Sequence, residues 1–116
     1  MGVDVAADVV SDEDLAVQRD DVRCERCSAV VAHRSAAVVR AGRHVHTFRN
    51  PAGWSWTVRC FRDAPGCRSE GELTTDATWF PGHAWCFAPC TSCGQHLGWW
   101  YVGASSFVGL IANRVT

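Results

Sequence analysis

Two pairs of cysteines have the spacing of metal-binding turns. Two residues separate Cys24 from Cys27, and two separate Cys90 from Cys93. This spacing lets one tight turn direct both sulfurs at a single ion, and four thiolates make the tetrahedral set that suits zinc. Such a site has no open coordination position for water or substrate. We therefore predict one structural Zn²⁺ ion rather than a catalytic metal.

The separation of the two pairs indicates what the ion would hold together. Residues 28–89 lie between them, a far longer interval than in a zinc ribbon. The metal would therefore join the beginning of the domain to its end, with most strands in the loop that it closes. Two other interpretations of these cysteines stay open from the spacing alone, a redox-active dithiol and four buried free thiols.

Three further cysteines bring the total to seven. We expect Cys60 in the core, because it lies on the apolar face of a predicted strand, and Cys86 packed beside Trp85. A disulfide between Cys60 and Cys67 is the alternative if the intervening loop folds back. An odd number of cysteines with metal spacing favours reduced thiols and the cytoplasm. We see no secretory signal and no membrane span.

Three of the six tryptophans surround the second cysteine pair. We predict that Trp79, Trp85 and Trp99 lie on loops held by the metal and form an aromatic cage. The alternative is that they belong to the core. Indole walls accept either a cation or a flat neutral ring. Residues 77–101 contain no Asp or Glu, which favours the neutral guest, although Asp76 is close in sequence.

The charges divide the chain into two parts. Residues 1–25 carry eight acids and two arginines, and the rest of the 116-residue chain carries four acids and nine arginines. We predict a flexible acidic arm at 1–21, with a helix start at Ser11, and one folded domain at 22–116. The net charge of −1 argues against a nucleic-acid partner. We expect a monomer with no membrane partner.

Short apolar runs between Gly and Pro turns predict an all-β domain. The clearest run is 54–61, in which apolar and polar residues alternate. In another, we expect Leu97, Trp99 and Tyr101 on one face. A loop is expected at 63–71, and no strand is expected between 78 and 96. The expected strands are 29–33, 36–40, 45–48, 54–61, 97–102 and 107–111.

The sequence shows no catalytic motif. The histidines have no Ser or Cys partner at a recognisable spacing, and there is no Gly-rich phosphate loop. We expect each histidine on the surface or behind the site, and we predict that the protein is not an enzyme. The histidines are His33, His44, His46, His83 and His96.

Taken together, these motifs resemble one known family, the thalidomide-binding (CULT) domain of cereblon in its single-domain bacterial form. The resemblance covers about residues 22–114, and the combination is far more specific than any single motif. The motifs are Cys24-x-x-Cys27, His44-Val-His46, Phe48-x-Asn50-Pro51-Ala-Gly53, Trp79-Phe-Pro-Gly-His-Ala-Trp85, Cys90-x-x-Cys93-Gly-x-His96-Leu-Gly-Trp99 and Phe107-x-Gly-Leu-Ile111.

The resemblance implies a β-tent, in which two antiparallel sheets are packed at a steep angle and pinned by structural zinc. It implies a cage for cyclic imides, including glutarimide, thalidomide-type drugs, cyclised Gln or Asn at protein C-termini, and uridine-like rings. Three tryptophans would be the walls. The remaining implied ligand-site residues are Asn50 and Pro51 at the rim, Trp56 and Tyr101 as supports, and Ala77, Thr78 and Trp79 through their backbone groups.

The sequence also departs from the family pattern. Ala77 and Thr78 replace a His-Ser pair of the animal proteins, and we expect binding to survive because the backbone makes the bonds there. Trp56 is bulkier than expected, and His83 replaces an aromatic residue, a change expected to alter the mouth of the cage. The Lon-like domain and the adaptor-binding segment of the animal proteins have no counterpart, so we expect no ubiquitin ligase adaptor as partner.

Two alternative functions, from other functional classes, compete with imide binding. A reader of methylated lysine would use the same cage for a cation. A β-tent oxidoreductase such as methionine sulfoxide reductase B would need a reactive cysteine near the C-terminal strands, and no cysteine follows Cys93. The imide-binding module is the preferred interpretation.

Overall fold

The computed structural model describes Leu15 and residues 19–116. Most of the predicted acidic arm, including the helix start at Ser11, lies outside the described residues. The strands are β1 (Asp21–Arg23), β2 (Val30–His33), β3 (Val45–Arg49), β4 (Ser55–Phe61), β5 (Glu70–Thr74), β6 (Ala84–Pro89), β7 (His96–Val102) and β8 (Phe107–Ile111), and a 3₁₀ helix, η2, spans Arg34–Ala36. None of the helical segments described is long and apolar enough to cross a membrane.

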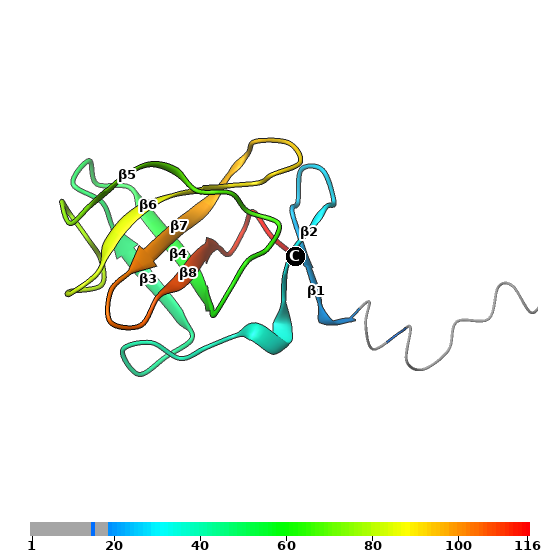
Figure 1. Cartoon of the computed structure of the whole chain (residues 1–116), viewed down its shortest axis with the longest axis horizontal. Helices are drawn as coiled ribbons and strands as arrows, with labels where there is room; N and C mark the ends of the chain where they lie inside the picture. The colour runs from blue at the N-terminus through cyan, green and yellow to red at the C-terminus, as the bar shows by residue number, and fades with distance from the viewer. Residues whose placement is uncertain (1–14, 16–18) are drawn as a thin grey trace, which may run out of the picture.

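The strands form two antiparallel sheets, which confirms the predicted fold class. One sheet pairs β1 with β2, and the other has the order β3-β4-β8-β7-β6-β5. Figure 1 shows the turn between β1 and β2 beside the loop between β6 and β7 at one end of the molecule. The β3–β4 turn and the β5–β6 loop lie at the opposite end (Figure 1). The fold therefore separates the two cysteine pairs from the tryptophan-rich loop.

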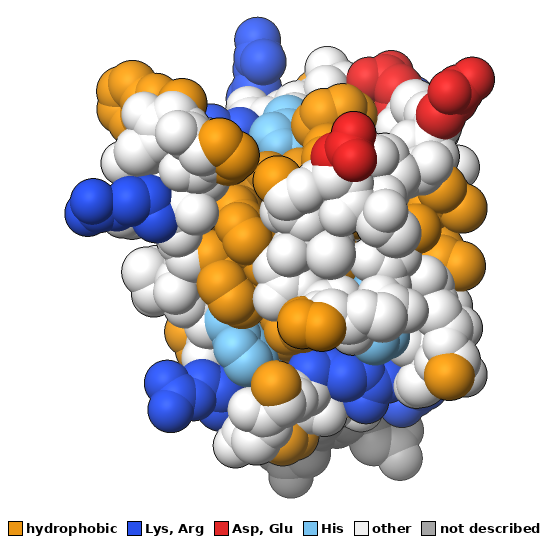
Figure 2. Space-filling model, turned by 90° about the vertical axis from the view of Figure 1, so that its left-hand side faces the viewer, with side chains coloured by type: hydrophobic (Ala, Val, Ile, Leu, Met, Phe, Trp, Pro, Cys, Tyr) orange, Lys and Arg blue, Asp and Glu red, His pale blue; other side chains and the backbone are white. Residues whose placement is uncertain are grey.

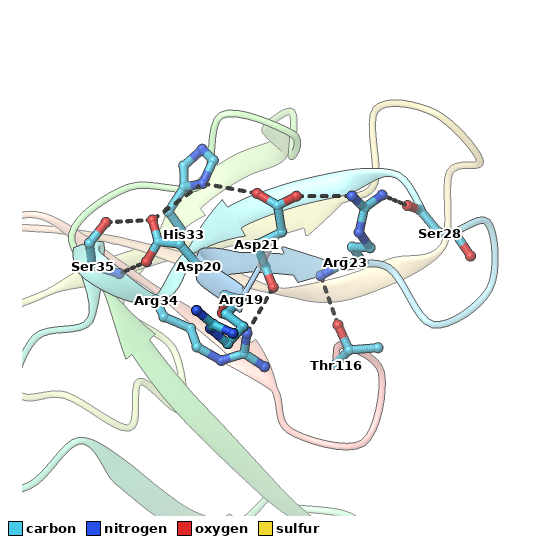
Figure 3. Close-up of polar contacts among 9 residues, drawn as sticks. All are labelled: Arg19, Asp20, Asp21, Arg23, Ser28, His33, Arg34, Ser35 and Thr116. Carbon is cyan, nitrogen blue, oxygen red and sulfur yellow. Dashed lines mark hydrogen bonds and ion pairs between the residues drawn. The ribbon is translucent and has the colours of Figure 1, made fainter. Parts of the chain in front are cut away.

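Backbone bonds and a polar network fasten the small sheet to the large one. The amide of Glu25 donates to the carbonyl of Arg114 at 2.9 Å, and the amide of Thr116 donates to the carbonyl of Arg23 at 3.0 Å. Figure 3 shows the side-chain contacts of the same region, in which the Thr116 hydroxyl accepts from the Arg23 amide. Asp20 accepts from both the amide and the hydroxyl of Ser35. The segment that follows β8 thus closes the sheet edge beside β1.

The buried residues divide into two clusters, one toward each end. The first cluster includes Val22, Val31, Phe61, Leu97 and Leu110, together with two of the paired cysteines, Cys24 and Cys90. The second is mainly aromatic and includes Val58, Cys60, Phe80, Trp99, Tyr101, Phe107 and Ile111, with Trp56, Trp79 and Trp85 packed against it. Burial of apolar area in both clusters supplies the driving force for folding.

Five of the six expected strands are present near their predicted bounds, and the sixth is wrong. The expected strand at 36–40 is instead the end of η2 followed by isolated bridges at Ala37 and Arg40. The amide of Ala37 donates to the carbonyl of Arg34, and His46 Nε2 lies 2.8 Å from the Arg40 carbonyl oxygen. Turn and side-chain hydrogen bonds therefore occupy backbone groups that a β-sheet would otherwise pair.

Three strands, β1, β5 and β6, are not among those predicted, and β1 begins at Asp21, the last residue of the predicted arm. The first four residues of β5, Glu70–Leu73, are all exposed, so the strand has no alternating apolar pattern to detect. The loop expected at 63–71 thus ends where β5 begins. Trp85 was expected on a loop but lies within β6, paired with Thr74 of β5 and Tyr101 of β7. Its cage position therefore depends on sheet register.

The expected common face of β7 is correct for Trp99 and Tyr101 but wrong for Leu97. The register of β6 against β7 shifts between Phe87 and Pro89. Such an irregularity changes which residues share a face. Leu97 is fully buried in the first cluster, whereas the ring of His96 lies 4.8 Å from that of Trp99. His96 therefore takes the place on this face that the alternation assigned to Leu97.

Candidate functional site

The four paired cysteines meet at one point, where they could hold a metal ion. Their sulfurs all lie within 4.8 Å of one another. Cys24 and Cys93 approach to 3.7 Å between sulfurs, as do Cys27 and Cys90. A tetrahedron with Zn–S bonds of about 2.3 Å has edges of about 3.8 Å. The donor set and its spacing therefore fit a tetrahedral metal ion, and no position is left open for a substrate.

The surroundings of the cluster affect its thiols differently. Burial raises the pKa of Cys24 to about 12. The backbone amide of Ala29 is the main cause that lowers the pKa of Cys27 to about 7. A bound cation stabilises thiolates strongly, so it would outweigh the effect of burial on Cys24 and act in the same direction as the Ala29 amide on Cys27. The metal-free cluster would hold at least one protonated, buried thiol at neutral pH.

The other three cysteines lie outside the cluster. Cys60 is fully buried in the second core cluster and Cys86 is buried as well, which confirms both predictions. Cys60 and Cys67 belong to different core clusters and are not bonded to each other. Burial raises the pKa of Cys60 to about 11 and that of Cys67 to about 12. These thiols are packed, uncharged side chains.

A pocket of about 400 Å³ lies between the β3–β4 turn, β4, the β5–β6 loop, β6 and β7. Figure 2 faces the end of the molecule where these loops lie and shows a hollow with hydrophobic side chains along its floor. The lining residues are Asn50, Pro51, Trp56, Ala77, Trp79, Trp85, Phe87, His96, Trp99 and Tyr101. We refer to this pocket as the cage.

Eight of the nine predicted ligand-site residues line the cage, and Thr78 does not. The Thr78 hydroxyl donates to the carbonyl of Phe80 at 3.3 Å, and its amide donates to the carbonyl of Thr75 at 3.2 Å. Thr78 therefore stabilises the loop beside the cage. His83, which was expected to alter the cage mouth, contacts Pro81, Ser105 and Phe107 instead and is not a lining residue.

Edge-to-face contacts fix the tryptophan walls. The rings of Trp79 and Trp99 lie 4.9 Å apart at 78°, and those of Trp56 and Trp99 lie 5.6 Å apart at 83°. On its other side Trp79 stacks on Phe48 of β3 at 5.0 Å. Edge-to-face and offset stacked pairs are the preferred aromatic arrangements. The cage is therefore preformed by contacts among its own walls.

A hydrogen bond sets the orientation of the third wall. The indole nitrogen of Trp85 donates to the carbonyl of Asp76 at 2.7 Å. The next residue, Ala77, has a φ of 53°, in the left-handed region that costs energy for a residue with a β-carbon. The loop thus keeps a strained backbone at the cage, which is where strain is often functional. Among the described residues, none bonds the amide of Trp79 or the carbonyl of Ala77.

Two residues that line the cage, Phe87 and His96, are not among the predicted ligand-site residues. Phe87 is 40% exposed on β6, a strand that was not predicted. His96 belongs to one of the family motifs, but its position in the cage depends on the register shift between β6 and β7, which the sequence does not reveal. Burial, followed by the positive charge of Arg114, lowers the pKa of His96 to about 4. His96 is therefore neutral at physiological pH.

The expectation that every histidine lies on the surface or behind the site is wrong for two of the five. His96 lines the cage. His46 is only 8% exposed and belongs to the core, where its Nε2 bonds the carbonyls of Arg40 and Arg43. Neither has a nucleophile beside it among the contacts described.

The electrostatics of the cage disfavour a cationic guest. None of the ten lining residues is Asp or Glu. The guanidinium of Arg114 lies 5.3 Å from the ring centre of Trp56, and Arg114 affects the pKa of the cage residue His96 more than Glu70 does. A cation cage normally presents ring faces without a competing cation. The walls are therefore apolar, aromatic and near a positive charge.

These features define the class of the protein: an all-β domain with a four-cysteine cluster at one end and an aromatic cage at the other. No family model matches the chain. It is 38% identical over 50 residues to Protein cereblon of Gallus gallus, which covers 43% of this chain and 11% of that protein. It is 33% identical over 81 residues to Protein cereblon of Drosophila willistoni, a match that covers 66% of this chain and 13% of that protein.

A longer match is to Protein cereblon of Drosophila pseudoobscura pseudoobscura. It is 32% identical over 103 residues, covering 79% of this chain and 16% of that protein. The chain thus carries a cereblon-like domain. It corresponds to less than a fifth of the length of the curated relatives it matches.

Proposed function

We propose that this domain is a non-enzymatic binding module for cyclic imides. The observation that carries the proposal is the composition of the cage, where three tryptophans meet without a carboxylate among the described lining residues and with Arg114 nearby. A flat neutral ring gains dispersion contacts with indole faces and meets no repulsion. A glutarimide ring has this shape and is neutral.

The polar atoms of the imide require backbone partners. The amide of Trp79 and the carbonyl of Ala77 lie beside the cage, and no described residue bonds them. We assign them to an imide carbonyl and the imide N–H, respectively. Thr78 holds the loop, Asn50 and Pro51 form the rim, and Trp56 and Tyr101 support the walls. A buried polar ring binds well only if its groups are paired in this way.

The class of ligand includes free glutarimides, thalidomide-type drugs, peptides with a C-terminal cyclic imide, and uridine-like rings. The four-cysteine cluster would hold one structural Zn²⁺ ion. Its role would be to fix the fold, because four thiolates leave no coordination position for a ligand. We propose no catalytic residue.

Titration with bare glutarimide, followed by tryptophan fluorescence, tests the proposal. We expect saturable one-to-one binding in the micromolar range, equivalent to about −8 kcal/mol. A trimethyl-lysine peptide is the matched competitor, because it would use the same walls as a cation. Binding of that peptide without binding of glutarimide, by zinc-loaded folded protein, would refute the imide assignment.

A further inference from the structure

A second cavity adjoins the cage and shares a wall with it. Its volume is about 360 Å³, and Trp56 lines both cavities. The amide of Ala112 donates to the carbonyl of Thr57 at 2.8 Å, which continues the pairing of β4 with the segment after β8. The lining residues are Trp54, Ser55, Trp56, Thr57, Ile111, Ala112, Asn113 and Arg114.

Arg114 is the charged group of this second cavity, and the fold holds it in place. Its Nη1 donates to the carbonyl of His96 at 2.9 Å, and its guanidinium lies over the ring of Trp56. No described carboxylate lies within ion-pair distance of it. A guanidinium has five N–H donors. Arg114 therefore has donors left for an anionic ligand.

The rest of the cavity suits a short peptide segment. Trp54 is 69% exposed at its edge, and Ser55, Thr57 and Asn113 contribute polar groups. None of the eight lining residues is acidic. An exposed indole beside hydroxyl and amide groups offers both apolar contact and hydrogen bonds. The cavity is thus positive, half apolar and next to the cage.

A cyclised C-terminal residue can enter the cage only with its preceding residue at the mouth, because the peptide bond joins them directly. We propose that the second cavity binds the side chain of that preceding residue and selects a carboxylate, Asp or Glu, through Arg114. This inference rests on the proposed imide function and names its substrate class: peptides with an acidic residue before a C-terminal cyclic imide. Trp56 separates the two subsites and contacts both parts of the ligand.

Three synthetic peptides test the proposal on the zinc-loaded, unmodified protein. Each ends in the same glutarimide residue, and the preceding residue is Glu, Gln or Lys. We expect the Glu peptide to bind roughly two- to fivefold more tightly than the Gln peptide, the size of a partly exposed charge pair. The Lys peptide should bind most weakly. Raising the salt concentration should reduce the difference between Glu and Gln.

The Arg114→Gln variant provides the second measurement. The ratio of the affinities for the Glu and Gln peptides should fall to about one in this variant. Arg59→Gln is the control, because it removes a guanidinium that does not line the second cavity. It should keep the ratio of the unmodified protein. Equal affinities for all three peptides in the unmodified protein would overturn the subsite and leave the cage intact. Failure of bare glutarimide and of every peptide to bind would overturn the cage and the subsite together.

Discussion

The two ends of the domain reach their geometry by different routes. At the metal end, all four sulfurs come from two short turns, and each pair is three residues apart in sequence. At the cage end, ten residues from five separate segments must meet. A local turn fixes the first arrangement, whereas sheet register and ring packing fix the second. The comparison teaches that each cysteine pair is encoded locally, although the fold must bring the two pairs together, whereas the cage is encoded globally.

Removal of the metal should produce the largest effect. We expect a Cys93→Ser variant, or a strong chelator, to unfold the domain, because a metal bound to the cluster would join segments far apart in sequence and its binding free energy would be folding free energy. Thermal unfolding and metal content measure this. Cys86→Ala, which changes a buried cysteine outside the cluster, should retain the metal. Glutarimide binding by metal-free protein would show that the two ends are independent.

Truncation of a cage wall should have the next largest effect. We expect Trp79→Ala or Trp99→Ala to weaken glutarimide binding by about 2–4 kcal/mol, which is typical of a buried aromatic anchor, while the metal remains bound. Fluorescence titration and metal analysis check both parts. Trp100→Phe is the control, because Trp100 lies on the same strand but packs against the first core cluster. Unchanged affinity in either cage variant would refute the assignment of the walls.

A pH effect on stability should report on His96. Its pKa in the folded protein is about 4, below the ordinary value of 6.5. The unfolded chain therefore binds more protons between these values, so stability falls as the pH drops from about 6.5 to 4. We expect His96→Gln to lose part of that dependence, about 2–5 °C in the unfolding midpoint.

The control for this pH effect is Val39→Ala, a change at an exposed position that carries no titratable group. It should keep the dependence of the unmodified protein, and protonation of the cysteine cluster is common to both variants. Thermal unfolding at pH 7.5 and pH 5 is the measurement. Identical pH profiles for the His96 variant and the unmodified protein would contradict the cause assigned to the low pKa, which is burial beside Arg114 and partly opposed by Glu70.

The smallest expected effect comes from the strained loop of the cage. Ala77 has a φ of 53°, where glycine avoids the steric cost of a β-carbon. We expect Ala77→Gly to raise the free energy of unfolding by about 0.5–1 kcal/mol, as measured by denaturant titration. The matched change Ala52→Gly should not stabilise, because Ala52 has no positive φ. Destabilisation by Ala77→Gly would mean that the loop gains nothing from relief of strain.

The sequence predicted the all-β class, the four clustered cysteines and eight of the residues around the cage. The cysteine spacing was sufficient because a two-residue interval has few backbone solutions. Phe87 and His96 could not be predicted, since both depend on an unpredicted strand or on the register shift between β6 and β7. The second cavity could not be predicted either, because Arg114 contacts Trp56 only through the pairing of β4 with β8.

Arg114 also connects the two ends of the domain. Its carbonyl accepts the amide of Glu25, which lies between the first two cysteines, and its guanidinium bonds the carbonyl of His96 at the cage. The Glu25 amide proton is consequently a natural reporter for hydrogen–deuterium exchange. Its exchange rate should slow when the metal binds and slow again when an acidic imide peptide binds, so one proton would record both events.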